Sequence, residues 1–295
     1  MTDNKLILLK IKESTGLRLA LLFGSFFMLL LISSFLSQAI SQISGISERS
    51  GLLINSTFQC FLAFIIPALI TAKFASNSPL RWLDLSGKVT WKPFAGVIIV
   101  YLLFIPAMNK LVEWNANIHF PVFLQGLENM FRTWEENGKA TTDIILENHG
   151  VFQMILSVVV VGLLTGFSEE IFFRGAMQKI FIQSSVGKTT AIWITAIIFS
   201  TFHFQFFGFV PRMLMGAFFG YLVVRTGSLW VPIFAHALNN SMVVIFSGIY
   251  GVSGENNFIE KIGLNETGFP VTAFISASLT LLFIYYFKGF FFSRK

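Results

Sequence analysis

Charged residues divide the chain into eight apolar windows whose lengths predict membrane-spanning helices. A helix needs about 20 predominantly apolar residues to cross a bilayer, and seven of the windows meet or nearly meet that length. The exception has only 12 residues, but Arg212 and Arg225 flank it and can extend their charged groups beyond its ends. The fourth window predicts one long helix that continues through Glu169 to about Ile182. The charge-free windows are residues 19–47, 50–72, 93–109, 148–168, 189–211, 213–224, 226–254 and 267–287.

The composition agrees with this pattern. Hydrophobic residues make up 54% of the 295 residues and charged residues only 12%, whereas soluble domains are about 25% charged. We therefore predict an all-α, polytopic membrane protein with about eight transmembrane helices. The first window is too long for the core of a signal peptide, which predicts a retained span. The single Cys60 excludes an internal disulfide and a metal site built from cysteines.

The division of the chain follows from the same windows. We expect one membrane domain with three regions. Residues 1–150 hold three spans and the longest loop, residues 151–247 hold the central helices, and residues 248–295 hold a loop and the last span. In the longest loop, 110–149, apolar residues recur at helical spacing over 122–136, which predicts an amphipathic helix lying on the outer interface.

The positions of Lys and Arg predict the orientation in the bilayer, because inner loops are enriched in both. With the N-terminus inside, 15 of the 21 Lys and Arg residues fall on the inner side and 6 on the outer side. We therefore expect an integral protein of the cell membrane with both termini in the cytoplasm. The net charge of +6 follows this topology, so it does not indicate binding to nucleic acid.

Four polar residues fall inside apolar segments, where an ionisable group is costly and usually has a task. They are Glu169, His203 and the pair His236 and Asn240, which share one helical face at a spacing of four. Glu169 and His203 are each 17 residues from Val186 in the turn between their helices, so antiparallel packing places them at one depth. His236 lies at a similar depth, roughly 13 Å from the next inner turn. We predict one site, reached from the inner side.

The two adjacent acids are expected to have different roles. Glu170 and Arg174 are four residues apart, so they can pair on one face of the helix and support its structure. Glu169 lies about 100° around the helix, on the side of Gly162 and Gly166, and is free to face a cavity. Small residues on that side let a neighbouring helix approach closely.

These groups favour hydrolysis of an acyl bond without a covalent intermediate. A carboxylate and an imidazole can hold and deprotonate a water, and a second imidazole with an amide can stabilise an oxyanion. We favour this arrangement without a cofactor, although a zinc ion bound by Glu169, His203 and His236 is chemically reasonable. Taken singly, an intramembrane histidine is more often a packing residue, and Asn240 could simply join two helices. The matched depth of all four residues favours a functional site.

The same residues resemble the CAAX-protease and bacteriocin-processing family of intramembrane proteases, also called the Abi or type II CAAX prenyl endopeptidase family. Three motifs carry the resemblance: Glu169-Glu170-x-x-x-Arg174, Phe199-x-x-x-His203 and His236-x-x-x-Asn240. All three occur in the family's order, and together they are highly specific, although each alone would be weak. The matched region runs from about 151 to 244, within the central region, which we take as the catalytic core.

The resemblance implies a function for each residue. Glu169 and His203 would activate a water, and His236 with Asn240 would hold the oxyanion, while Glu170, Arg174 and Phe199 would support the site. We predict an intramembrane endopeptidase that cuts a membrane-associated or prenylated, CAAX-like peptide. The alternatives are a non-catalytic membrane scaffold or a bacteriocin-immunity or regulatory protein, and a proton-coupled transporter. The intact motifs argue against a scaffold, and no pair of broken-helix repeats supports a transporter.

The predicted orientation can be tested by cysteine labelling on a Cys60→Ser background. Cysteines introduced at Lys10, Lys188 and Lys295 should react only with a reagent admitted to the cytoplasm, because the inner side carries most of the Lys and Arg. Cysteines at Lys139 and Lys261 should react with an external reagent. External labelling at position 188 would contradict both the orientation and the inner access to the site.

Overall fold

The computed structural model describes residues 14–147, 150–252, 258–264 and 270–290, which form helices joined by turns and contain no strand. Each of the eight predicted windows corresponds to a helical segment in this part of the chain. These segments are α2 (Thr15–Ser41), α3 to α4 (Glu48–Ala75), α6 (Lys92–Ala116), α8 to α10 (Val151–Ile182), α11 (Lys188–Thr201), α12 (Phe209–Thr226), α13 (Trp230–Tyr250) and α15 (Val271–Tyr286).

Several shorter elements complete the described chain. They are α5 (Pro79–Trp82), α7 (Gln125–Leu146), α14 (Phe258–Lys261) and single 3-10 turns at Val122–Leu124, Phe206–Gly208 and Lys288–Phe290. The two longest spans are not uniformly α-helical. π-helical turns lie at Gln59–Ile65 between α3 (Glu48–Phe58) and α4 (Ile66–Ala75), and at Val158–Leu164 and Ile171–Met177 on either side of α9 (Thr165–Glu170).

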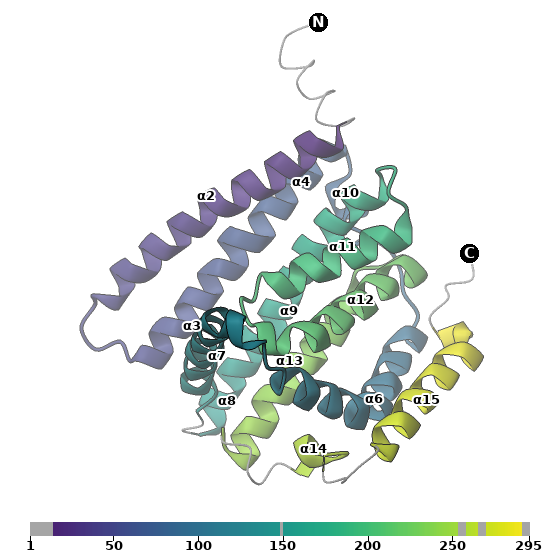
Figure 1. Cartoon of the computed structure of the whole chain (residues 1–295). Helices are drawn as coiled ribbons and strands as arrows, with labels where there is room; N and C mark the ends of the chain where they lie inside the picture. Colours follow the sequence, from purple (N-terminus) through teal and green to yellow (C-terminus); the bar gives the residue numbers. More distant parts are fainter. Residues whose placement is uncertain (1–13, 148–149, 253–257, 265–269, 291–295) are drawn as a thin grey trace, which may run out of the picture.

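Helix lengths and composition confirm the predicted all-α, polytopic membrane protein. Among the described residues, six helices are long and apolar enough to cross a membrane, and α15 is a shorter apolar helix. Figure 1 shows α2 beside α4 at one edge of the bundle and α6 beside α15 at the other. The segment α8 to α10 and helices α11, α12 and α13 lie between these edges. This arrangement surrounds the central helices with protein, so charged side chains on them can be kept away from lipid.

The boundary expected between the fifth and sixth windows was wrong. The chain leaves helix at Thr201 and turns through Phe204, whose φ of +53° lies in the left-handed region, and α12 then begins at Phe209. Pro211 therefore lies in the first turn of α12, where its missing N–H costs no intrahelical hydrogen bond. Arg212, which was taken as the end of an apolar window, is a residue of this helix. A charge inside a helix was thus misread as the helix boundary.

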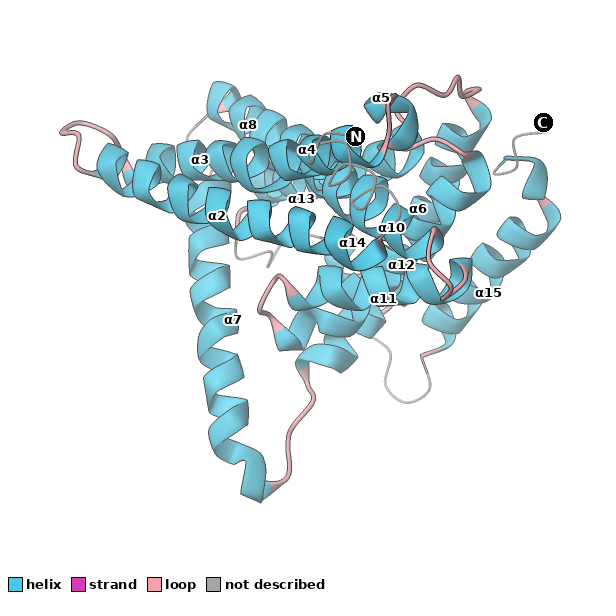
Figure 2. Ribbon diagram, turned by 90° about the horizontal axis from the view of Figure 1, so that it is seen from above, coloured by secondary structure: helices cyan, strands magenta, loops and turns pink. Residues whose placement is uncertain are grey.

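The amphipathic helix predicted over 122–136 is longer than expected. It is α7, which runs along one side of the bundle in Figure 2 and continues to Leu146. Glu128 anchors its first turns because its carboxylate accepts hydrogen bonds from the backbone N–H of Phe120 at 2.7 Å and from Arg132 Nε at 2.9 Å. These hydrogen bonds lower the pKa of Glu128 to about 2. The position of α7 on the outer interface, the three regions of the chain and the cytoplasmic termini stay predictions.

Two glycines allow the segment carrying the adjacent acids to lie directly against α13. A Cβ at Gly166 would stand 2.9 Å from the backbone N of Ala237, and a Cβ at Gly162 would stand 2.3 Å from Ser241 Oγ. Both distances are shorter than van der Waals contact. At Gly166 the neighbouring atoms are backbone, which cannot turn aside, so that position requires glycine. The close approach confirms the packing role predicted for these small residues. It also sets the distance between Glu169 and Glu170 on one helix and His236 on the other.

A cluster of phenylalanines supports the other side of the acidic segment. Phe172 and Phe173 are almost fully buried and contact Phe26 of α2 and Phe199 of α11. The ring centroids of Phe173 and Phe199 are 5.1 Å apart in an edge-to-face arrangement, the geometry preferred by the quadrupoles of aromatic rings. This packing connects the acidic helix to α2 and α11.

Candidate active site

The central element of the site is a buried ion pair between Glu170 and Arg174. Arg174 Nη1 donates to Glu170 Oε1 at 2.7 Å, and both side chains are 0% exposed. Arg174 Nη2 donates to the backbone carbonyl of Gly216 at 3.0 Å, and its guanidinium lies 4.3 Å from the centre of the Phe199 ring. The pairing predicted from the spacing of four is therefore present. Its buried position makes it a structural requirement, because a single charge left there would have no compensation.

Glu170 has a second partner that the sequence did not indicate. His236 Nδ1 lies 2.9 Å from Glu170 Oε1, the same oxygen that accepts from Arg174. An ionised carboxylate can only accept hydrogen bonds, so Nδ1 of His236 is the donor. The ring also stacks on Phe219, with centroids 5.1 Å apart. Glu170 thus fixes both the orientation and the tautomer of His236, and leaves Nε2 facing the other acid.

Glu169 occupies the neighbouring position on the helix with a free carboxylate oxygen. Its Oε2 is buried, has no hydrogen-bond partner in the described part of the chain, and lies 3.8 Å from His236 Nε2. That distance is too long for a direct hydrogen bond, but a water can bridge two polar atoms so separated. Both acids end α9, between two π-helical segments. Such π-bulges occur frequently at functional sites.

His203 joins this group through Phe199. His203 Nδ1 donates to the backbone carbonyl of Phe199 at 2.9 Å, since a carbonyl oxygen cannot donate. In the neutral ring this leaves Nε2 as a hydrogen-bond acceptor. The Phe199 ring contacts both imidazoles edge-to-face, with its centroid 5.0 Å from that of His203 and 5.8 Å from that of His236. The second motif therefore orients one histidine and packs against the other.

Asn240 lies one turn beyond His236 on α13, but its amide is directed to other groups. Its Nδ2 donates to the carbonyl of Val161 at 3.3 Å, and its Oδ1 accepts from Asn239 at 3.2 Å. These contacts connect α13 to the segment that precedes Glu169. The role of Asn240 as an oxyanion donor stays a prediction.

Arg212 is a component of the site that sequence reasoning missed. Its guanidinium donates to the backbone carbonyl and the side-chain oxygen of Gln205, and its charge acts on both Glu169 and His203. Its charge also acts on Glu135 of α7, whose carboxylate accepts from the backbone N–H of Phe207 at 3.2 Å. Burial raises the pKa of Glu135, and these two contacts oppose the increase. In the sequence, the signal that could have indicated Arg212 was its position as a single cation between two apolar windows.

The zinc alternative requires three side chains to point at one position. No group of three or more His, Cys, Asp or Glu side chains in the described ranges is placed to hold a metal ion. One ring nitrogen of His236 is already bound to Glu170. A zinc ion held by Glu169, His203 and His236 would therefore need these side chains to move together, and that alternative stays untested.

The fold and site define a polytopic α-helical membrane protein with an acid–imidazole centre buried in its helix bundle. Comparison with known proteins then shows which proteins the chain resembles. Residues 151–242 match the family model described as type II CAAX prenyl endopeptidase Rce1-like. The chain is also 27% identical over 207 residues to "Putative membrane peptidase YdiL" of Bacillus subtilis (strain 168). The matched region covers 61% of this chain and 80% of the relative. No solved structure matches the chain.

These matches confirm the predicted resemblance to the CAAX-protease and bacteriocin-processing family. The matched residues 151–242 contain all three motifs and the segments that carry them, α8 to α10, α11, α12 and most of α13. The family is one of membrane proteases, and the helices of this chain are those of an integral membrane protein.

Arg174→Ala should destabilise the protein strongly. The substitution leaves the Glu170 carboxylate buried without its cation, and breaking a buried pair costs about 3–5 kcal/mol. Thermal unfolding of the purified protein in detergent measures the effect, with Arg81→Ala as a control at an exposed arginine. Equal unfolding temperatures for the two variants would contradict the structural role of the pair.

Proposed function

We propose that this chain is an intramembrane endopeptidase that hydrolyses a peptide bond of a membrane-associated peptide by direct attack of a water. One observation carries the proposal. The buried Oε2 of Glu169 has no hydrogen-bond partner in the described chain and faces Nε2 of an imidazole that Glu170 holds through Nδ1. A desolvated carboxylate beside an oriented imidazole has the arrangement needed to bind and deprotonate a water.

The roles follow from which atoms remain available. Glu169 would act as the general base that takes a proton from the attacking water. The free Nε2 of His203 would accept a hydrogen bond from the same water or receive its proton. The proton that Glu169 takes from the water would pass to Nε2 of His236, which then donates toward the oxyanion of the tetrahedral intermediate while Nδ1 stays on Glu170. The leaving amine would take this proton as the C–N bond breaks, and the acid product would keep the oxygen of the water. Asn240 would complete the oxyanion site by turning its amide away from Val161.

Arg174 and Glu170 would keep this arrangement fixed during the reaction. Their ion pair places a compensated carboxylate behind His236, so the imidazole keeps one orientation whichever protonation state its other nitrogen has. Preorganised groups of this kind need no rearrangement when charge develops in the transition state. They would act by positioning His236, without contacting the substrate.

An apolar pocket beside the site supports a lipophilic substrate. It has a volume of about 220 Å³ and lies between α6, α12 and α13, with Tyr101 and Phe104 among its lining residues. Phe219, which stacks on His236, and Asn239, which bonds to Asn240, also line it. The pocket therefore adjoins the proposed catalytic groups directly. We propose that it holds an apolar side chain or a prenyl group of a CAAX-like peptide next to the scissile bond.

Glu169→Gln should abolish proteolysis and leave folding nearly unchanged. Loss of a general base typically lowers the rate about 10²- to 10⁴-fold, and Glu169 takes no part in the Glu170–Arg174 pair. The control is Glu136→Gln, which alters an exposed carboxylate on α7. Membrane peptides from cells with the wild type and each variant are compared by mass spectrometry, and the fragments found are then tested with purified protein.

The comparison also separates the proposal from its alternative. Fragments present with the wild type and Glu136→Gln but absent with Glu169→Gln would support an endopeptidase. Cleavage by purified Glu169→Gln at nearly the wild-type rate would contradict the assigned base. The same fragments in cells lacking the protein altogether would favour a non-catalytic scaffold or an immunity protein.

A further inference from the structure

A second pocket, which we call the aromatic pocket, lies between α7 and the turn that follows α11. It has a volume of about 250 Å³. Thr201 and Phe204, which line it, lie within two residues of His203 in the chain. The backbone N–H of His203 also donates to the carbonyl of Ser200, another lining residue, at 3.3 Å. The aromatic pocket therefore adjoins the proposed site at His203. Its lining residues are Phe131, Trp134, Ser200, Thr201, Phe204, Gln205, Phe206 and Phe209.

Ring contacts join the two walls of the aromatic pocket. Phe131 of α7 stacks on Phe206, with centroids 5.2 Å apart. Trp134, one turn further along α7, meets the Phe204 ring edge-to-face at 6.2 Å. These contacts hold α7 against the turn, so the pocket is preformed. A preformed pocket binds its occupant without the cost of ordering its own walls.

The lining suits an uncharged, apolar occupant. Five of its eight residues are aromatic, and none of the described residues that line it carries a charge. The two hydroxyl groups are already used within the protein, because those of Ser200 and Thr201 donate to backbone carbonyls at 2.7 and 2.9 Å. An anionic group would therefore find no cation in this lining, whereas an aromatic ring would find several ring edges and faces to pack against.

Gln205 adds a hydrogen-bond donor to this apolar surface. Arg212 Nη2 donates to Gln205 Oε1 at 2.8 Å, and because a guanidinium can only donate, the oxygen of the amide must face it. The amide nitrogen of Gln205 has no acceptor in the described part of the chain. A Cβ at Gly138 would stand 2.7 Å from this nitrogen, which places it at the α7 wall. A backbone carbonyl of an occupant is the group that this donor fits.

We propose that the aromatic pocket binds an aromatic side chain of the peptide substrate, next to the bond that is cut. The inference rests on the proposed function. The pocket between α6, α12 and α13 adjoins His236 and Asn240 through its lining, whereas the aromatic pocket adjoins His203. A peptide bound across the catalytic groups can therefore reach both pockets. Gln205 would donate to a backbone carbonyl of the same peptide, which an acyl chain of a lipid could not accept.

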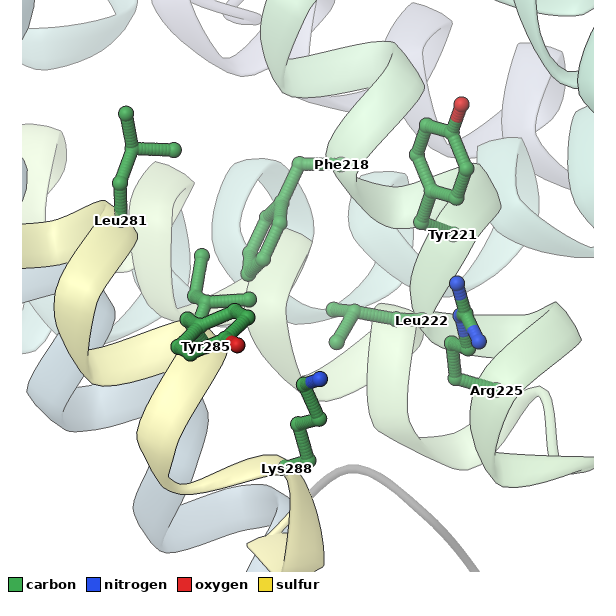
Figure 3. A pocket seen from close by; sticks show the side chains of 8 residues that line it. Phe218, Tyr221, Leu222, Arg225, Leu281, Tyr285 and Lys288 are labelled. Atoms are coloured by element: carbon green, nitrogen blue, oxygen red, sulfur yellow. The ribbon is translucent and has the colours of Figure 1, made fainter.

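The pocket between α12 and α15 provides an internal comparison. It lies at the opposite end of α12, as Figure 3 shows, and has a larger volume of about 420 Å³. Phe218, Leu222 and Leu281 give it an apolar wall of its own. A probe that merely partitions into apolar grooves would occupy this pocket as readily as the aromatic pocket.

Photochemical cross-linking of the purified full chain in phosphatidylcholine nanodiscs tests the proposal. The probe is the uncharged peptide acetyl-Leu-Ala-X-Ala-Leu-amide, in which X is a diazirine derivative of phenylalanine. Mass spectrometry should locate the adducts on the residues that line the aromatic pocket. The same peptide with phenylalanine at X should suppress labelling at an about tenfold lower concentration than the peptide with alanine at X, because burial of the ring favours binding.

A filled pocket provides the matched variant. Thr201→Trp should lower the labelling about tenfold or more, because the new ring occupies the space of the probe. The control is Ile197→Trp, one turn earlier on α11, where the side chain is 45% exposed and lies outside the pocket lining. Equal labelling of the two variants would overturn the proposal. Equal competition by the phenylalanine and alanine peptides, or equal labelling of the pocket between α12 and α15, would overturn it as well.

Comparison of membrane peptides separates this inference from the proposed function. Thr201→Trp should remove fragments cut beside an aromatic residue and retain those cut beside small residues, whereas Glu169→Gln should remove both. A uniform loss of all fragments in Thr201→Trp would overturn the pocket's role in specificity. If no fragment depends on Glu169, the proposed function is wrong, and the cross-linking result still decides whether the aromatic pocket binds an aromatic peptide.

Discussion

The arrangement of the site depends on one buried carboxylate, that of Glu170. A single oxygen of this group accepts from Arg174 at 2.7 Å and faces His236 Nδ1 at 2.9 Å. An ionised group so far from water is tolerated only when it is paired and hydrogen-bonded. The pair consequently fixes three segments relative to one another, the helix carrying the acids, α12 through the carbonyl of Gly216, and α13 through His236.

The two adjacent acids have different surroundings because successive residues of a helix point about 100° apart. Glu170 faces the cation and becomes part of the structure, whereas Glu169 faces His236 Nε2 with one oxygen left without a partner in the described chain. Gly166 makes this possible, since any side chain there would push α13 away and lengthen both contacts. The carboxylate proposed as the general base is thus held in place by its neighbour Glu170, which has a structural role in the proposal.

The spacing of residues along one helix predicted only the contacts that are made within that helix. The interval of four between Glu170 and Arg174 was sufficient to predict their pairing, and the apolar windows were sufficient to predict the helices. The three polar motifs were sufficient to predict the family resemblance. The bond between Glu170 and His236 joins residues 66 positions apart, and no periodicity within one helix specifies such a contact. Arg212 was misread because a cation inside an apolar region was taken as a loop, whereas the preceding helix had already ended at Thr201, before the turn that contains Phe204. Glu135 of α7, whose charge acts on Arg212, belongs to a segment that the sequence placed on the membrane surface.

A double-mutant cycle on Glu170 and His236 tests the central contact most directly. Glu170→Gln, His236→Phe and the double variant are compared with the wild type by their free energies of unfolding in mixed micelles with a denaturing detergent. Residues in direct contact within one charged network show coupling energies of about 0.5–3 kcal/mol, and we predict a favourable coupling in that range. If the two effects add within about 0.5 kcal/mol, as they do for residues that do not interact, Glu170 does not hold His236 and the proposed organisation of the site is wrong.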